Sequence, residues 1–301
     1  MIDTSVNVAG VVWKNPVTTA SGTFGSGREF GEWVDLNRLG AVTVKGVADQ
    51  PWKGNPAPRI AETYGGMLNS VGLQNPGVDY FIQEDIPFLR QFDTKIVVNL
   101  CGHTVEEYCA VAEKISEADV DLLELNISCP NVSAGGITFG TDPKMAEYVV
   151  QEVKKYTKKP LLVKLTPNVT DITEIARAVE SGGADGISLI NTLLGMRIDI
   201  RRRQPVLANK VGGFSGPAIK PVAVRMVYQV AKVTNLPIVG MGGISTWEDA
   251  IEFIMAGATA VAVGTANFTD PLATMRIVSG IESYMEKEGI SSLDEIRGII
   301  Q

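Results

Sequence analysis

The clearest signal of the fold lies in residues 236–264, "LPIVGMGGISTWEDAIEFIMAGATAVAVG". It opens with an apolar run at 236–241, continues as a helical pattern and closes with a second apolar run at 259–264. A capping box marks the predicted helix start, because the Ser245 hydroxyl can accept from the third helical N–H while Glu248 reaches back to the cap. The stretch therefore predicts strand, helix and strand, the unit from which parallel sheets are built.

This unit recurs along the chain. Short β-rich runs lie at residues 15–21, 41–46, 95–100, 122–127, 160–165, 186–191, 236–241 and 259–264. Helical patterns lie between the later runs, and one of them places Ile172, Ile175, Ala176 and Val179 on a single face. Eight alternations predict the α/β class and a (β/α)8 TIM barrel.

The barrel is predicted to fill one domain, residues 1–301. A second capping box, Thr104 to Glu107, predicts a further helix start. Two segments, about 47–92 and 193–216, are longer than the repeating pattern requires. We predict that both are insertions at the C-terminal face of the strands, where loops cover the pocket of this fold.

Composition narrows the function classes. The chain has 301 residues, 45% of them apolar, and its net charge of −7 disfavours nucleic acid as a partner. Apolar runs stay well short of the roughly 18 residues that span a bilayer, so a cytoplasmic protein without membrane contact is expected. Three cysteines without CxxC spacing predict no disulfide framework, iron-sulfur cluster or metal site.

Polar residues and glycines follow the predicted strands, which in a barrel brings them to one face. They are Ala20, Ser21, Gly22, Lys45, Asn99, Asn126, Lys164, Asn191, Thr192, Gly242, Gly243, Gly264 and Thr265. The runs "GMGGIS" (240–245) and "VGTANF" (263–268) follow strands seven and eight, the usual phosphate site of the fold. We therefore expect a polar ligand with a nucleotide-like phosphate.

Single side chains suggest the chemistry. Lys45 and Lys164 could pair with an anion or form a Schiff base, and the residues alone leave both readings open. Cys129 precedes Pro130 and the glycine-rich segment 133–140, which predicts a mobile flap carrying a thiol that can act as a base. The only histidine, His103, is expected to pack on the helix that follows it.

The remaining cysteines, Cys101 and Cys109, are expected to be structural. The amide-rich segment "MLNSVGLQNPG" (67–77) suits a ring with alternating C=O and N–H groups, such as a pyrimidine, or is simply a turn. Arg201, Arg202 and Arg203 are expected to be solvated on the second insertion, with contact to a partner subunit as the alternative.

Taken in order over nearly the whole chain, these motifs resemble dihydroorotate dehydrogenase. The resemblance rests on "NPVTTASGTFGSG", "TVKG", "NSVGLQNPG", "NISCPN", "LLVKLTPN", "GGFSGPAIKP", "GMGGI" and "VGTANF". A cysteine as base resembles class 1, and "ASGTFGSGREF" (20–30) is more similar to the NAD-dependent 1B catalytic subunit than to the fumarate-using 1A homodimer.

The resemblance implies oxidation of (S)-dihydroorotate to orotate in pyrimidine (UMP) biosynthesis, with Cys129 as the catalytic base. It implies one flavin mononucleotide (FMN), held by Ala20, Ser21, Lys45, Asn99, Asn126, Lys164, Ile190, Gly216, Gly242, Gly243, Gly264 and Thr265. It implies a substrate site formed by Lys45, Asn69, Val71, Gly72, Leu73, Asn126, Asn131, Asn191 and Thr192, the last of which is often serine in the family.

Electrons are implied to pass from FMN to a partner subunit carrying FAD and a 2Fe-2S cluster, and then to NAD. The implied assembly is a heterotetramer with a homodimer of this chain at its core. Two alternatives remain beside this one, a fumarate-using 1A homodimer and an aldolase with Lys164 as its Schiff-base nucleophile.

Overall fold

The computed structural model describes residues 2–128 and 139–300 and contains the predicted barrel. Eight parallel strands hydrogen-bond in the order β3-β16-β15-β10-β9-β8-β7-β4. They are β3 (Val17–Thr19), β4 (Ala41–Thr43), β7 (Lys95–Leu100), β8 (Leu122–Asn126), β9 (Leu161–Lys164), β10 (Gly186–Leu189), β15 (Ile238–Met241) and β16 (Ala260–Val263). Each lies within one of the eight predicted runs, so the strand predictions and the barrel are confirmed.

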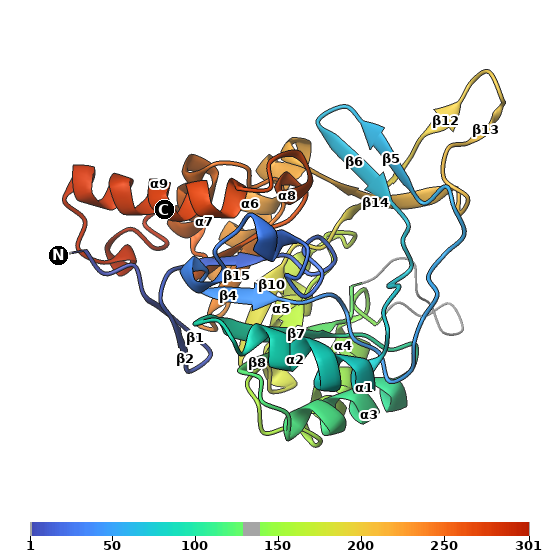
Figure 1. Ribbon diagram of the computed structural model, residues 1–301, viewed down its shortest axis with the longest axis horizontal. Coiled ribbons are helices and arrows are strands. Elements are labelled where there is room, and N and C mark those ends of the chain that lie inside the picture. Colours follow the sequence, from blue (N-terminus) through green and yellow to red (C-terminus); the bar gives the residue numbers. More distant parts are fainter. Residues whose placement is uncertain (1, 129–138, 301) are drawn as a thin grey trace.

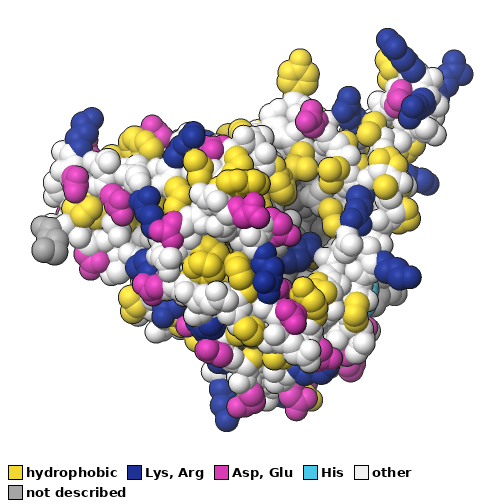
Figure 2. Space-filling view, viewed as in Figure 1, with side chains coloured by type: hydrophobic (Ala, Val, Ile, Leu, Met, Phe, Trp, Pro, Cys, Tyr) yellow, Lys and Arg dark blue, Asp and Glu magenta, His cyan; other side chains and the backbone are white. Residues whose placement is uncertain are grey.

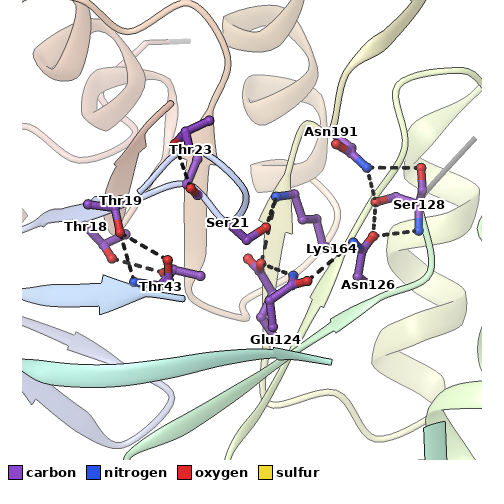
Figure 3. A network of polar contacts seen from close by, with 12 residues as sticks. Thr18, Thr19, Ser21, Thr23, Thr43, Glu124, Asn126, Ser128, Lys164 and Asn191 are labelled. Carbon is purple, nitrogen blue, oxygen red and sulfur yellow. Dashed lines mark hydrogen bonds and ion pairs between the residues drawn. The ribbon is translucent and has the colours of Figure 1, made fainter. Parts of the chain in front are cut away.

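The barrel closes between β3 and β4 through threonine side chains and one backbone hydrogen bond, from Gly40 N–H to the Val17 carbonyl at 3.1 Å. The Thr19 hydroxyl donates to the carbonyl of Thr43 and accepts from its backbone N–H, both at 3.1 Å. The hydroxyls of Thr18 and Thr43 also lie 3.1 Å apart. Figure 3 shows these threonines meeting across the gap between the two strands. We call this joint the threonine seam.

Helices surround the barrel (Figure 1). The longer ones are α3 (Val105–Ser116), α4 (Pro143–Lys154), α5 (Ile172–Ser181), α6 (Lys220–Ala231), α7 (Trp247–Ala256) and α9 (Ala273–Glu288). The apolar face predicted for α5 is buried, at Ile172, Ile175, Ala176 and Val179. Three consecutive short helical elements precede β7: α1 (Val78–Tyr80), the π-helical η3 (Phe81–Asp85) and α2 (Ile86–Leu89). None of the described helices is both long and apolar enough to cross a bilayer.

The two predicted caps turn out differently. Thr104 caps α3 as expected, although the Glu107 carboxylate accepts from the N–H of His103 instead of that of the cap. The cap predicted at Ser245 is wrong by one residue, because Thr246 is the N-cap of α7 and Asp249 completes the capping box. Asp249 is shorter than Glu248, yet it accepts from the N–H groups of both Ser245 and Thr246.

The insertions meet in a second, antiparallel sheet of order β11-β14-β6-β5. Its strands are β5 (Ile60–Thr63), β6 (Gly66–Asn69), β11 (Leu193–Met196) and β14 (Val211–Ser215). The hairpin β12 (Ile198–Asp199) and β13 (Gln204–Pro205) projects from this sheet and exposes Arg201, Arg202 and Arg203, the basic tip at the upper right of Figure 2. Their solvation is therefore confirmed.

The remaining elements are short. They are the hairpin β1 (Val6–Val8) and β2 (Val11–Trp13), the single turns η1 (Phe30–Glu32), η2 (Leu36–Arg38), η4 (Pro217–Ile219) and η5 (Leu293–Glu295), and α8 (Ala266–Thr269).

Candidate active site

A cavity of about 950 Å³ opens where the barrel strands end and the insertion sheet begins. Figure 2 shows the surface hollowed at this place. Its volume lies in the range of small-molecule and cofactor sites. Both insertions contribute to its wall, through Met67 and Asn69 of β6 and Ser215 of β14.

The structure brings the predicted residues together at this cavity. All of those that fall in the described part of the chain border it: Ala20, Ser21, Lys45, Asn69, Val71, Gly72, Leu73, Asn99, Asn126, Lys164, Ile190, Asn191, Thr192, Gly216, Gly242, Gly243, Gly264 and Thr265. Cys129 and Asn131 lie outside the described residues, as does most of the predicted flap. The strand-end rule thus located the pocket from sequence.

A buried ion pair lies at the floor of the cavity. Lys164 and Glu124 are exposed by only 4% and 2% of their side chains, and Lys164 Nζ lies 3.8 Å from Glu124 Oε1. Lys164 Nζ also donates to Ser21 Oγ at 3.2 Å. The same Glu124 oxygen accepts from Asn99 Nδ2 at 2.6 Å. Glu124 therefore joins two cavity residues from below.

Amides and a hydroxyl continue this network toward the other side of the cavity (Figure 3). Asn126 Nδ2 donates to Asn99 Oδ1 at 3.4 Å, and Asn126 Oδ1 accepts from Ser128 Oγ at 2.8 Å. Asn191 Nδ2 in turn donates to Ser128 Oγ at 2.8 Å. The Asn126 backbone carbonyl accepts from the Tyr108 hydroxyl of α3 at 2.6 Å, which fixes the strand end.

Glu124 and Ser128 are not among the residues predicted from the sequence. A signal for Glu124 was present, because it is the one charged residue in the apolar run "LLEL" (122–125) of a strand buried throughout. No comparable signal marked Ser128, since serine beside a predicted loop is ordinary.

Glycines line the opposite end, after β14 and β15. Gly216, Gly242 and Gly243 have φ of +114°, +124° and +82°, a region that side chains rarely adopt. A Cβ on Gly243 would lie 2.8 Å from the backbone N of Lys220 and 3.0 Å from the Gly216 carbonyl oxygen. The backbone at this end is therefore packed too closely for any side chain, as at sites where a phosphate approaches main-chain N–H groups.

Lys220, the lysine beside these glycines, already forms ion pairs with two carboxylates. Lys220 Nζ contacts Asp249 at 2.7 Å and Glu252 at 2.9 Å, and these hydrogen bonds raise the pKa of Lys220. Burial alone would raise the pKa of Asp249, but hydrogen bonds from Lys220, Ser245 and Thr246 outweigh burial, and the pKa is lowered. An anion here would therefore depend on the glycine backbone more than on Lys220.

Comparison with known proteins agrees with the motifs. The family model described as dihydroorotate dehydrogenase matches residues 3–285. The chain belongs to the dihydroorotate dehydrogenase family. A relative named dihydroorotate dehydrogenase B (NAD(+)), catalytic subunit, from Alkaliphilus metalliredigens is 71% identical over 297 residues, which cover 99% of this chain and 98% of the relative.

Two more relatives carry the same name. The protein from Lachnoclostridium phytofermentans is 64% identical over 300 residues, covering 100% of both chains. The protein from Petrotoga mobilis is 53% identical over 300 residues, again covering 100% of both chains. Membership of the dihydroorotate dehydrogenase family thus extends over the whole length of the chain.

The cavity fits FMN, the cofactor that the family implies. FMN combines a flat ring, whose edge carries C=O and N–H groups, with a terminal phosphate. The buried Lys164 and the Asn99 amide supply polar partners at one end, and the backbone of Gly242 and Gly243 borders the cavity at the other, where main-chain N–H groups can approach a phosphate. In the described part of the chain, no three His, Cys, Asp or Glu side chains are grouped to hold a metal.

His103 and two cysteines lie away from the cavity wall. The His103 ring packs on Trp52, with centroids 4.0 Å apart, and its Nδ1 lies 3.1 Å from Glu107 Oε2 of α3. Packing on that helix is therefore confirmed. Cys101 and Cys109 are buried, and burial raises the pKa of the Cys109 thiol. Neither cysteine borders the cavity, which agrees with the expected structural role.

Gly243→Ala is expected to weaken FMN binding by about tenfold or more, since the new Cβ collides with backbone and disturbs the phosphate end. FMN affinity is measured by equilibrium dialysis of the flavin-stripped protein. Gly289→Ala is the matched control, because Gly289 also has a positive φ of +69° but meets nothing within 4 Å. Equal FMN affinity in the two variants would remove the phosphate role from Gly243.

Proposed function

We propose that this chain oxidises (S)-dihydroorotate to orotate in de novo pyrimidine biosynthesis and is the catalytic subunit of a class 1B enzyme. The observation that carries the proposal is one cavity bordered by Lys164, which pairs with Glu124 beneath it, by the amides of Asn69, Asn126 and Asn191, and by a glycine-lined end. The names of the similar proteins support the same reaction.

In this proposal, one FMN occupies the part of the cavity between Lys164 and the glycines. Its holding residues are Ala20, Ser21, Lys45, Asn99, Asn126, Lys164, Ile190, Gly216, Gly242, Gly243, Gly264 and Thr265. When bound, FMN supplies the acceptor for the hydride that leaves the substrate. Thr265 Oγ1 donates to Ser215 Oγ at 2.8 Å, which links the end of β16 to β14 beside the proposed phosphate position.

The substrate is proposed to lie on the insertion side of the cavity. Its partners are Lys45, Asn69, Val71, Gly72, Leu73, Asn126, Asn131, Asn191 and Thr192, of which Asn131 lies outside the described residues. Amides can satisfy the alternating C=O and N–H groups of the pyrimidine ring. Lys45 is half-buried and can offset negative charge on the substrate.

Cys129 is proposed as the general base that takes the proton from C5 of dihydroorotate as hydride leaves C6. It lies outside the described residues, directly after Ser128. Ser128 itself is buried and bonded to Asn126 and Asn191, two of the proposed substrate contacts. The residue before the base is thus anchored to the substrate pocket.

Electrons are proposed to leave through a partner subunit that carries FAD and a 2Fe-2S cluster and passes them to NAD. The words "catalytic subunit" and "NAD(+)" in the names of the similar proteins support this route. The proposed assembly is a heterotetramer around a homodimer of this chain, working in the cytoplasm. The exposed arginines 201–203 are candidates for the partner contact.

Anaerobic titration of the FMN-loaded chain with dihydroorotate tests the reaction. We expect the flavin absorption to bleach and orotate to appear in equal amount. A flavin that stays oxidised would contradict the proposal. Borohydride trapping of a carbonyl substrate on Lys164 would instead support an aldolase.

The isolated chain is expected to reduce an artificial dye with dihydroorotate but to reduce NAD poorly, because the route to NAD is proposed to lie in the partner. Addition of the electron-transfer subunit should restore NAD reduction. Steady-state assays with dye, NAD and fumarate measure the three routes. Efficient NAD or fumarate reduction by the chain alone would overturn class 1B and leave dihydroorotate oxidation intact.

A further inference from the structure

Glu124 lies under the cavity and does not border it, yet residues on both sides of the cavity connect to it. On one side it approaches Lys164, and on the other it begins the hydrogen-bond series through Asn99, Asn126, Ser128 and Asn191. We propose that Glu124 is a positioning residue that holds the Asn99 end of this series in the one direction that the Ser128 backbone also requires, so that Asn191 presents an acceptor to an N–H group of the substrate ring.

The direction of donation along the series follows from which groups can donate a hydrogen bond and which can only accept one. An ionised carboxylate accepts and cannot donate, so Asn99 must turn Nδ2 toward Glu124. Asn99 Oδ1 is then left to accept from Asn126 Nδ2. Asn126 Oδ1 consequently accepts from Ser128 Oγ, which uses its one proton there. Ser128 Oγ can therefore only accept from the next residue, Asn191.

The far end of the series has the same direction for an independent reason. The Ser128 backbone N–H donates to Asn126 Oδ1 at 3.3 Å, and the Ser128 backbone carbonyl accepts from Asn191 Nδ2 at 3.1 Å. Neither backbone group can reverse its role. Because both ends demand one orientation, all three amides are fixed, as expected of a fully satisfied buried network.

The consequence appears at Asn191. Its Nδ2 is used by Ser128, so Oδ1 faces away from Ser128 (Figure 3) in a residue that borders the cavity. Oδ1 is an acceptor, which matches a ring N–H and disfavours a ring atom that itself accepts. This inference rests on the proposed function, because it concerns how the same pocket selects its pyrimidine.

Glu124 is also the counter-ion of Lys164, a residue proposed to contact the cofactor. Removing the carboxylate leaves Lys164 buried without its counter-ion and leaves Asn99 Nδ2 without its charged acceptor. Glu124→Gln removes the charge and introduces a donor while keeping the shape. Glu124→Asp keeps the charge and accepts only, but is one methylene shorter. Comparison of the two separates hydrogen-bond direction from packing.

The experiment measures orotate affinity from the change in flavin absorption of the protein with FMN in excess, together with the FMN affinity of the stripped protein. Glu124→Gln is expected to weaken both by about tenfold, and Glu124→Asp by less than about threefold. The matched control is Ser188→Ala, because the Ser188 hydroxyl is buried in β10, beside Lys164 of β9, with no hydrogen-bond partner among the described residues. It is expected to change neither affinity.

An aspartate variant as impaired as the glutamine variant, or unchanged orotate affinity in Glu124→Gln, would overturn the inference. Should Glu124→Gln fail to fold, Ser128→Ala tests the series without burying a charge, and orotate affinity must then fall by about threefold. Unchanged affinity in Ser128→Ala also overturns it. Failure of the wild-type protein to bind orotate or to be reduced by dihydroorotate would instead remove the proposed function, so the two failures are distinguishable.

Discussion

Cys129→Ala is expected to slow dihydroorotate oxidation by roughly 10²–10⁴-fold, the usual contribution of a general base. FMN and orotate should still bind, because the residues proposed to hold them, Asn131 aside, border the cavity in the described part of the chain and do not include residue 129. Stopped-flow reduction of bound flavin by dihydroorotate measures the chemical step, and orotate titration measures the site. A near-normal reduction rate in this variant would exclude Cys129 as the base.

Cys129→Ser provides the matched comparison. A hydroxyl is a far weaker base than a thiol, so this variant should be slow at neutral pH and recover as pH rises. The reduction rate of both proteins across pH 6 to 10 separates loss of the base from loss of the site. A serine variant whose rate does not change with pH would count against the assignment.

Lys164→Met is expected to lower the free energy of unfolding by about 3–5 kcal/mol, the loss typical of a buried ion pair broken on one side. Glu124 would remain as an uncompensated carboxylate with 2% of its side chain exposed. The double variant Lys164→Met with Glu124→Gln should recover most of this loss. Urea denaturation with FMN in excess measures all three proteins.

The control for this experiment is Lys155→Met. Lys155 pairs with Glu152 at 2.6 Å, but its side chain is 60% exposed. Water screens such a pair, so its removal should change unfolding little. A double variant no more stable than Lys164→Met alone would show that Glu124 and Lys164 do not stabilise the fold as a pair.

Local patterns in the sequence were sufficient to predict the eight strands and the rim of the cavity. Parallel strands of a barrel end at one face, so Lys45, Asn126 and Lys164 could be grouped without knowing any distance between them. The same rule places Gly242 and Gly264 there, and the structure agrees. These predictions needed only the order of elements along the chain.

Other features depend on partners distant in sequence and could not be predicted. The insertion sheet pairs β6 with β14, where Asn69 and Gly213 are 144 positions apart, and neither strand shows that pairing by itself. Glu124 resembled an irregularity in an apolar strand until Asn99 and Lys164 were placed beside it. The N-cap of α7 shifted by one residue because serine, threonine, glutamate and aspartate can all form a capping box.

The threonine seam makes one joint of the barrel unlike the others. Opening the cylinder between β3 and β4 breaks the threonine hydrogen bonds and one backbone hydrogen bond, from Gly40 N–H to the Val17 carbonyl, whereas opening any other joint of the described strands breaks a backbone ladder. Local opening favours the joint with the fewest bonds to lose. Ser21 follows β3 and Lys45 follows β4, and both border the cavity. A ligand that contacts both residues therefore bridges this joint, and its binding energy stabilises the barrel against local opening between β3 and β4.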